Sequence, residues 1–218
     1  MENFTTSDYI DVTVAFLTMC GLIFSGIQLF LINSNRRKQY KQLRREKTAE
    51  MIMYYSQQIT KETKYKESIV LSLNDDQCID LYNCTPFIID EKTKKKLCSI
   101  CPHKIKCRKN NHKNELCKKD GRYYISDSVL YDLRGSTISY LNALESVLLT
   151  WELGIVERPV IEEQFSFLDK KRKKERALET FRTIAGSGHS YPAIEKFYQH
   201  LDLEASKKAE KSLKKILK

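Results

Sequence analysis

The sequence predicts an all-α fold with an N-terminal transmembrane helix, a helical stalk, and a helical bundle that carries an inserted cysteine-rich metal-binding module. Three observations support this prediction: an uncharged apolar run near the N-terminus, long stretches with helical hydrophobic spacing, and few turn-forming residues. The chain has 218 residues but only seven glycines and four prolines. This low content favours long helices and argues against a sandwich or barrel of many short strands.

The first predicted element is a membrane-spanning helix over residues 12–32, which carry no charged side chain. At about 1.5 Å per residue, this run matches the ~30 Å hydrocarbon core of a bilayer. A cleavable signal peptide is the alternative, but residues 1–11 contain three acidic residues and no lysine or arginine. Gly21 and Ser25 share one helical face with Gln28 nearby. This pattern favours self-association through the membrane helix, with chance occurrence as the alternative.

Positive charge follows the apolar run directly and sets the expected orientation. Residues 34–47 hold seven basic side chains and one acidic side chain. By the positive-inside rule, residues 1–11 are extracytoplasmic and the domain after the helix is cytoplasmic. The predicted location is therefore a membrane, with residues 34–218 on its cytoplasmic side. Six side chains are predicted to contact the lipid surface: Arg36, Arg37, Lys38, Lys41, Arg44 and Arg45.

Residues 33–73 are predicted to form a basic juxtamembrane stalk helix, because no glycine or proline interrupts residues 34–73. We expect the continuous helix to run to about Glu62. Its apolar stripe is broken, so packing against the domain's own core is as good an interpretation as a coiled coil. A second helix is expected after Asn74, which is placed as an N-cap with two acidic residues in the first turn.

Residues 123–218 are predicted to form a cytoplasmic helical domain. Ser126 is the expected N-cap of its first helix, and apolar residues then recur at spacings of three and four. Gly135 lies near the start of this helix, where a glycine favours a kink or a break. Pro159 is expected at the first position of a helix that ends at Gly186. Pro192 opens the last helix, whose basic amphipathic end is interpreted as a frayed terminus, with membrane binding as the alternative.

Residues 136–171 and 190–198 carry a resemblance to a known family. The shared features are Leu141-Asn142-x-x-Glu145, the Gly154-Ile155 turn, and the Tyr-Pro pair before the last helix. They resemble an uncharacterised family of small bacterial membrane proteins with one N-terminal membrane helix and a cytoplasmic helical domain. The resemblance covers roughly residues 8–73 and 125–201. The resemblance implies the architecture and a location in the bacterial inner membrane. Because some members look like phage-defence proteins, it also implies a setting in bacteriophage defence.

The Asn142 and Glu145 side chains have a structural interpretation that we prefer over a catalytic one. Three residues apart, they are neighbours on one helical face. We expect a buried hydrogen-bond pair that bridges to an adjacent helix.

Residues 84–122 form the predicted cysteine-rich inserted module, which has little apolar periodicity. Its chemically specific feature is the series Cys98, Cys101, Cys107 and Cys117, with Cys84 as an alternative ligand. A C-x-x-C pair and two later thiolates can complete a tetrahedron around zinc, and nearby lysines favour the thiolate form. In a reducing compartment, metal ligation is the better interpretation of such cysteines than disulfides.

The same cysteines have two alternative interpretations. The spacing C-x2-C-x5-C with a proline after the second cysteine looks like the iron–sulfur segment of AddB-type nuclease subunits and of some radical-enzyme auxiliary domains. The nuclease motifs themselves are not recognisable, so their activity is not carried over. Free thiols without metal are the remaining alternative.

No catalytic constellation is recognisable in the sequence, so a non-enzymatic role is expected. The chain has a formal net charge of +10, which favours anionic partners such as lipid headgroups or nucleic acid. The predicted function is a membrane-anchored effector or interaction protein that binds an unidentified cytoplasmic protein or signal. The alternative is a membrane-tethered nucleic-acid-binding or redox-sensing protein that uses the basic cysteine module.

Overall fold

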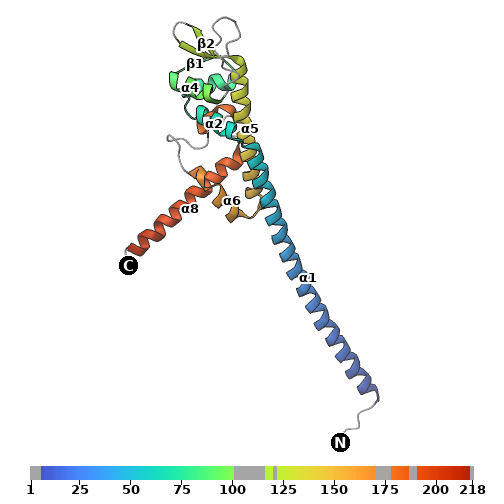
Figure 1. Ribbon diagram of the computed structural model, residues 1–218. Helices are drawn as coiled ribbons and strands as arrows, with labels where there is room; N and C mark the ends of the chain where they lie inside the picture. Colours follow the sequence, from blue (N-terminus) through green and yellow to red (C-terminus); the bar gives the residue numbers. More distant parts are fainter. Residues whose placement is uncertain (1–5, 101–115, 120–121, 170–177, 187–190, 217–218) are drawn as a thin grey trace. The chain divides into compact units, whose positions relative to one another are not determined.

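Figure 1 shows the computed structural model, which describes residues 6–100, 116–119, 122–169, 178–186 and 191–216. The chain divides into two units, residues 1–46 and residues 47–218. Helix α1 (Thr6–Gln58) contributes residues to both. The prediction of a mostly helical fold is confirmed for the described residues.

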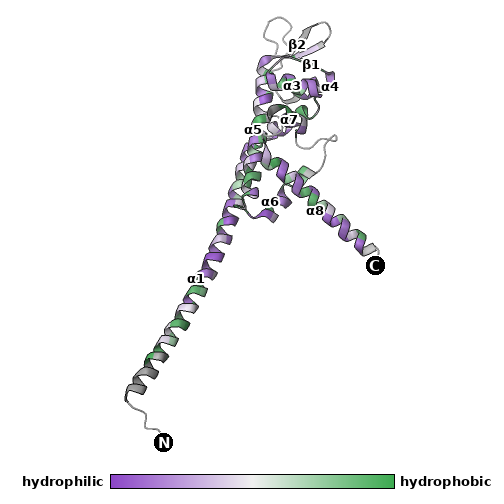
Figure 2. Cartoon of the chain, turned by 180° about the vertical axis from the view of Figure 1, so that it is seen from behind, coloured by the Kyte–Doolittle hydropathy of each residue, from purple (hydrophilic) through white to green (hydrophobic). Residues whose placement is uncertain are grey.

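The described residues of the first unit form the N-terminal part of α1, where Figure 2 shows hydrophobic residues in green. Within the described residues, α1 is the helix long and apolar enough to cross a membrane. Two hydroxyls inside the apolar run donate hydrogen bonds to carbonyls of the helix itself. Thr18 Oγ1 donates to the Val14 carbonyl at 2.8 Å, and Ser25 Oγ donates to the Gly21 carbonyl at 2.9 Å. These bonds make the two polar side chains compatible with an apolar environment.

The second unit is a helical domain arranged around helix α5 (Asp127–Glu152). Helix α5 contacts α2, α3 and α8. The other helices of this unit are α2 (Lys61–Val70), α3 (Asp75–Asn83), α4 (Glu91–Ile100), α6 (Arg158–Gln164), the 3-10 helix η1 (Ser166–Asp169), α7 (Glu179–Gly186) and α8 (Pro192–Ile216).

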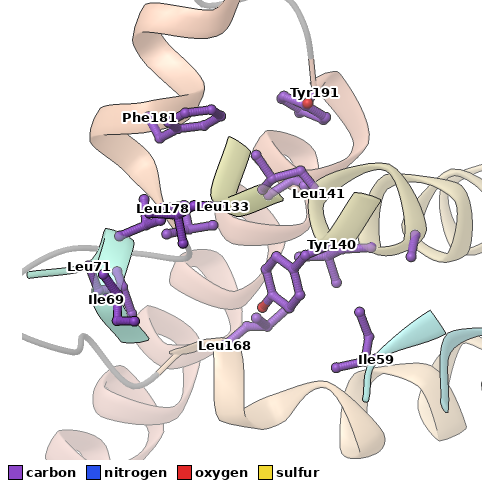
Figure 3. Close-up of a cluster of buried hydrophobic side chains, with 14 of the residues drawn as sticks. Ile59, Ile69, Leu71, Leu133, Tyr140, Leu141, Leu168, Leu178, Phe181 and Tyr191 are labelled. Atoms are coloured by element: carbon purple, nitrogen blue, oxygen red, sulfur yellow. The ribbon is translucent and has the colours of Figure 1, made fainter. Parts of the chain in front are cut away.

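A single hydrophobic core joins these helices. Figure 3 shows Leu133, Tyr140 and Leu141 of α5 in the middle of the cluster, among side chains from the other elements. Alternate three- and four-residue steps along α5 place Leu141, Leu144 and Leu148 on one buried face. Each such side chain stabilises the fold by about 1.5–3 kcal/mol relative to exposure.

Local capping signals in the sequence mark where two helices begin. Asn74 accepts from the Gln77 backbone N–H at 2.8 Å, and Gln77 Oε1 accepts from the Asn74 N–H at 3.0 Å. This reciprocal capping box confirms the predicted start of α3. Ser126 occupies the predicted N-cap position of α5, although its side chain makes no capping bond to the helix.

Helix α1 ends at Gln58, before the expected Glu62, and α2 follows. Thr60 is the N-cap of α2, where its hydroxyl accepts from the Thr63 N–H at 3.2 Å. Ile59, between the helices, is buried in the core. The break thus follows from a threonine that favours an N-cap and an isoleucine that is buried beside it.

A small three-stranded antiparallel sheet departs from the predicted all-α fold. Strand β3 (Arg122–Ile125) lies between β1 (Ile88–Ile89) and β2 (Leu116–Lys119). The strands fall within the cysteine-rich region and at its boundary with the helical domain. Three of the four β3 residues are Tyr123, Tyr124 and Ile125, whose aromatic and β-branched side chains suit a strand.

The segment between Pro159 and Gly186 also differs from the prediction. We expected one helix, but α6 ends at Gln164, η1 follows, and α7 forms a separate helix that ends at Gly186 as predicted. Phe165, the residue directly after α6, and Leu168 in η1 are both buried, so burial of these side chains outweighs continuation of the helix. Pro159 is the second residue of α6, and Pro192 starts α8 as predicted. Helix α5 runs through Gly135 without a break.

Candidate functional site

The apolar part of α1 presents its large side chains outward. Leu22 is 70% exposed and Phe30 is 73% exposed. Leaving such side chains in water costs about 1.5–3 kcal/mol each relative to burial. This surface is therefore suited to an apolar environment, and the helix is long and apolar enough to span a bilayer.

The basic segment after the apolar run keeps its predicted membrane-surface side chains exposed. These are Arg36, Arg37, Lys38, Lys41, Arg44 and Arg45. The one acidic residue of the segment, Glu46, accepts from the Gln42 side-chain amide at 2.9 Å. With seven basic residues and one acidic residue, residues 34–47 carry a net positive charge that suits anionic headgroups.

The predicted metal centre lies largely outside the described residues. Cys101 and Cys107 fall in an undescribed segment, and only the backbone of Cys98 in α4 and of Cys117 in β2 is described. The sheet register pairs Cys117 with Tyr124. The alternative ligand Cys84 is described. It is half-buried, and as the C-cap of α3 it adopts a left-handed conformation with φ 57°. Among the described side chains, no cluster of three metal-ligating groups is present.

Glu145 joins α5 to the start of α8. Its carboxylate accepts from the Ala193 N–H at 2.8 Å and from the Ile194 N–H at 3.0 Å. The first N–H groups of a helix have no partner within the helix, and the residue before α8 is Tyr191, which has no short side-chain acceptor. Glu145 therefore serves as the missing cap from another helix, and its charge also suits the helix N-terminus.

Asn142 does not share that role, which corrects the predicted buried pair. Its side chain is exposed, and its backbone carbonyl accepts from Ser146 Oγ at 2.8 Å. The bridge to an adjacent helix exists as expected, but Glu145 makes it without Asn142. A signal was present in the sequence: a glutamate between buried leucines, and a final helix that opens with Tyr-Pro and lacks its own capping side chain.

Lys66 makes a second polar contact across the core. Its side chain is 7% exposed, and its ammonium group lies 2.8 Å from Asp132 Oδ1 and 2.7 Å from Glu62 Oε1. It also donates to Ser136 Oγ at 3.1 Å. Burial alone lowers the pKa of Lys66, but the bonds to the two carboxylates outweigh it and raise the pKa above its ordinary value. The lysine is therefore charged and connects α2 to α5.

A third polar group lies where α5, α6 and α8 meet. Trp151 Nε1 donates to Glu162 Oε1 at 3.0 Å, and His200 Nε2 lies 3.1 Å from the same oxygen. The Trp151 ring packs against Phe197 and His200, with centroid separations of 5.0 Å and 5.1 Å. Like Glu145 and Lys66, these side chains hold helices together, and no sequence pattern specified that His200 would meet Glu162.

Two tyrosine hydroxyls meet inside the domain. Tyr55 near the end of α1 is hydrogen-bonded to Tyr140 of α5, and burial raises the pKa of Tyr55 to about 12. Burial also raises the pKa of Tyr140. Both phenols are therefore neutral at ordinary pH, which suits a structural contact better than proton transfer.

Comparisons with family models, with curated proteins and with solved structures give no match to this chain.

Proposed function

We propose that the protein is a single-pass protein of the bacterial inner membrane whose cytoplasmic helical domain acts as a non-enzymatic effector or interaction protein. The observation that carries this proposal is the apolar run of α1, whose described side chains are exposed throughout. A run of this length and composition suits a bilayer. The basic residues that follow favour an extracytoplasmic N-terminus and a cytoplasmic domain.

The polar groups buried in the domain support interaction rather than catalysis. Glu145 caps α8, Lys66 bridges α2 and α5, and Glu162 receives the Trp151 indole. Catalytic acids and bases commonly lie in a pocket with shifted pKa values and a free reacting position. In the described residues these three side chains instead make hydrogen bonds that join helices. The output of the domain is therefore proposed to be binding of a cytoplasmic protein or signal, and the family resemblance adds bacteriophage defence as the setting.

Self-association through α1 is the proposed means of passing a signal to the membrane. Gly21 and Ser25 form a small-residue face on which two helices can approach closely. A Cβ added at Gly21 meets no atom within 4 Å, so a larger side chain there leaves the single chain undisturbed. The same holds for Gly26, which lies on a different face of the helix.

These two glycines give a matched test of self-association. Gly21→Leu is expected to weaken association of the full-length protein in detergent micelles by about tenfold or more, because close packing of the helices is lost. Gly26→Leu is expected to leave association unchanged. Sedimentation equilibrium at several detergent concentrations measures both. A wild-type protein that stays monomeric, or equal weakening by the two variants, would contradict the proposal.

The metal module is the second part of the proposal, with zinc held by Cys98, Cys101, Cys107 and Cys117. Anaerobically purified protein is expected to contain about one zinc per chain, as a closed four-cysteine site does. Cys98→Ser with Cys101→Ser is expected to remove the metal, whereas Cys20→Ser in the membrane helix is expected to retain it. Elemental analysis measures the zinc and iron bound per chain, and the visible spectrum detects an iron–sulfur cluster. Colourless, metal-free protein would contradict a metal site. A brown protein that contains iron and sulfide would show that the cysteines hold an iron–sulfur cluster and not zinc.

The alternative function is membrane-tethered nucleic-acid binding through the lysine-rich cysteine module. The net charge of +10 favours it, and residues 102–119 hold no aromatic side chain for stacking on bases, which disfavours it. Micromolar affinity for duplex or RNA with a steep salt dependence, lost on deletion of residues 92–119, would support this alternative.

A further inference from the structure

The C-terminal part of α8 differs from the part that packs in the core. The last fully buried side chain of the helix is Tyr198, and all side chains from residue 205 to residue 214 are exposed. Two leucines in the part of α8 after Tyr198, Leu203 and Leu213, are 60% and 59% exposed. Residues 202–218 are called the α8 tail below. Within the described residues, the tail is a helix with no covering element.

Lysines dominate the tail, and its glutamates are already paired. Glu204 lies 2.8 Å from Lys207, and Glu210 lies 2.7 Å from Lys214. Lys208 and Lys211 have no acidic partner within 4 Å among the described side chains. Steps of three and four residues place Lys208, Lys211 and Lys215 on the same face of the helix. The tail therefore presents a row of positive charge, called the lysine face, that its own acids do not neutralise.

We infer that the lysine face binds anionic lipid headgroups, so that the α8 tail is a second, reversible contact with the membrane. The inference rests on the proposed anchor, because α1 keeps the tail at a high local concentration near the bilayer and makes a weak contact effective. The cytoplasmic leaflet is negatively charged and attracts lysines close to its surface. Each lysine brought to that surface contributes about fivefold in affinity, and three contribute about 100-fold.

The composition of the tail favours lipid over nucleic acid as the occupant. Residues 202–218 contain no aromatic side chain that would stack on bases. The exposed Leu203 and Leu213 lie on other faces of the helix, so the proposed contact rests on the charge of the lysine face. A lysine face without stacking side chains, held near a bilayer by the proposed anchor, suits lipid headgroups better than nucleic acid.

The test compares full-length protein in nanodiscs of zwitterionic lipid with nanodiscs that also contain anionic phosphatidylglycerol. Hydrogen exchange followed by mass spectrometry reports residues 12–32 and residues 203–216 separately. Anionic lipid is expected to slow exchange in the tail by about tenfold or more, and high salt is expected to abolish the effect. The variant Lys208→Glu, Lys211→Glu, Lys215→Glu is expected to lose it. The charge-matched control Lys61→Glu, Lys64→Glu, Lys95→Glu, at exposed positions outside the tail, is expected to keep it.

Three other outcomes of this experiment would overturn the inference, and each differs in which residues are protected from exchange. Equal exchange of the tail in both nanodiscs, with residues 12–32 protected, removes the lipid contact but leaves the anchor intact. Fast exchange in residues 12–32 and elution apart from the nanodiscs removes the anchor and the inference with it. Protection of the tail by a short RNA duplex, without protection by anionic lipid, assigns the lysine face to nucleic acid instead.

Discussion

Arginine at both Leu22 and Ile23 is expected to release the protein from membranes. Both positions lie near the middle of residues 12–32, and their side chains are 70% and 59% exposed, so the substitutions break no core contact. Each arginine at the centre of a membrane helix costs about 2.5–3.5 kcal/mol, which gives about 5–7 kcal/mol for the pair. The variant is expected to move from the carbonate-washed membrane pellet to the soluble or aggregated fraction.

The matched control for this variant is Tyr40→Arg with Leu43→Arg. These exposed apolar positions belong to the basic segment of α1, outside the proposed span. Arginine there adds to charge that already faces the headgroups, and the control is expected to stay with the membrane. If the Leu22 and Ile23 variant also remained in the washed pellet, α1 would not be the anchor.

Glu145→Ala is expected to destabilise the domain by about 2–4 kcal/mol. The substitution leaves the Ala193 and Ile194 N–H groups without their acceptor. Each bond to a charged group is worth about 1.5–3 kcal/mol, and because the place is only partly buried, water replaces part of the two lost bonds. Glu145→Gln is expected to have a smaller effect, because one amide oxygen remains as an acceptor. The single tryptophan, Trp151, packs on Phe197 of α8, so its fluorescence during urea unfolding follows the contact between α5 and α8.

Glu152→Ala provides the control on the same pair of helices. Glu152 of α5 pairs with Lys196 of α8, but the lysine side chain is mostly exposed. Exposed ion pairs contribute about 0–1 kcal/mol. Equal losses of stability for Glu145→Ala and Glu152→Ala would show that capping by Glu145 does not hold α8 in place.

Features encoded by neighbouring residues were the ones that the sequence could predict. The apolar run of α1, the N-cap at Asn74 and the start of α8 at Pro192 each depend on residues within one or two helical turns. Such local signals place elements along the chain. They do not determine which element packs against which.

Features that depend on distant residues were missed or only partly predicted. The sheet requires β3 to pair with β1, more than thirty residues earlier in the chain. The break after Gln164 follows burial of Phe165 and Leu168 among side chains from other helices, and no helix-breaking residue marks it. Glu145 was expected to bridge helices, but its partners are the backbone N–H groups of Ala193 and Ile194, and the one signal for them in the sequence is the missing capping side chain before the last helix. The cysteine ligands stay a prediction, since their side chains lie outside the described residues.

Membrane topology is the measurement that tests the central claim most directly. The wild-type protein with a C-terminal epitope tag is expressed in bacteria, and external protease is added to intact spheroplasts and to lysed ones. We predict that the tag resists protease in intact spheroplasts, is digested after lysis, and pellets with carbonate-washed membranes. Digestion of the tag in intact spheroplasts would place the helical domain outside the cytoplasm. Recovery of the protein in the soluble fraction would contradict the membrane anchor itself.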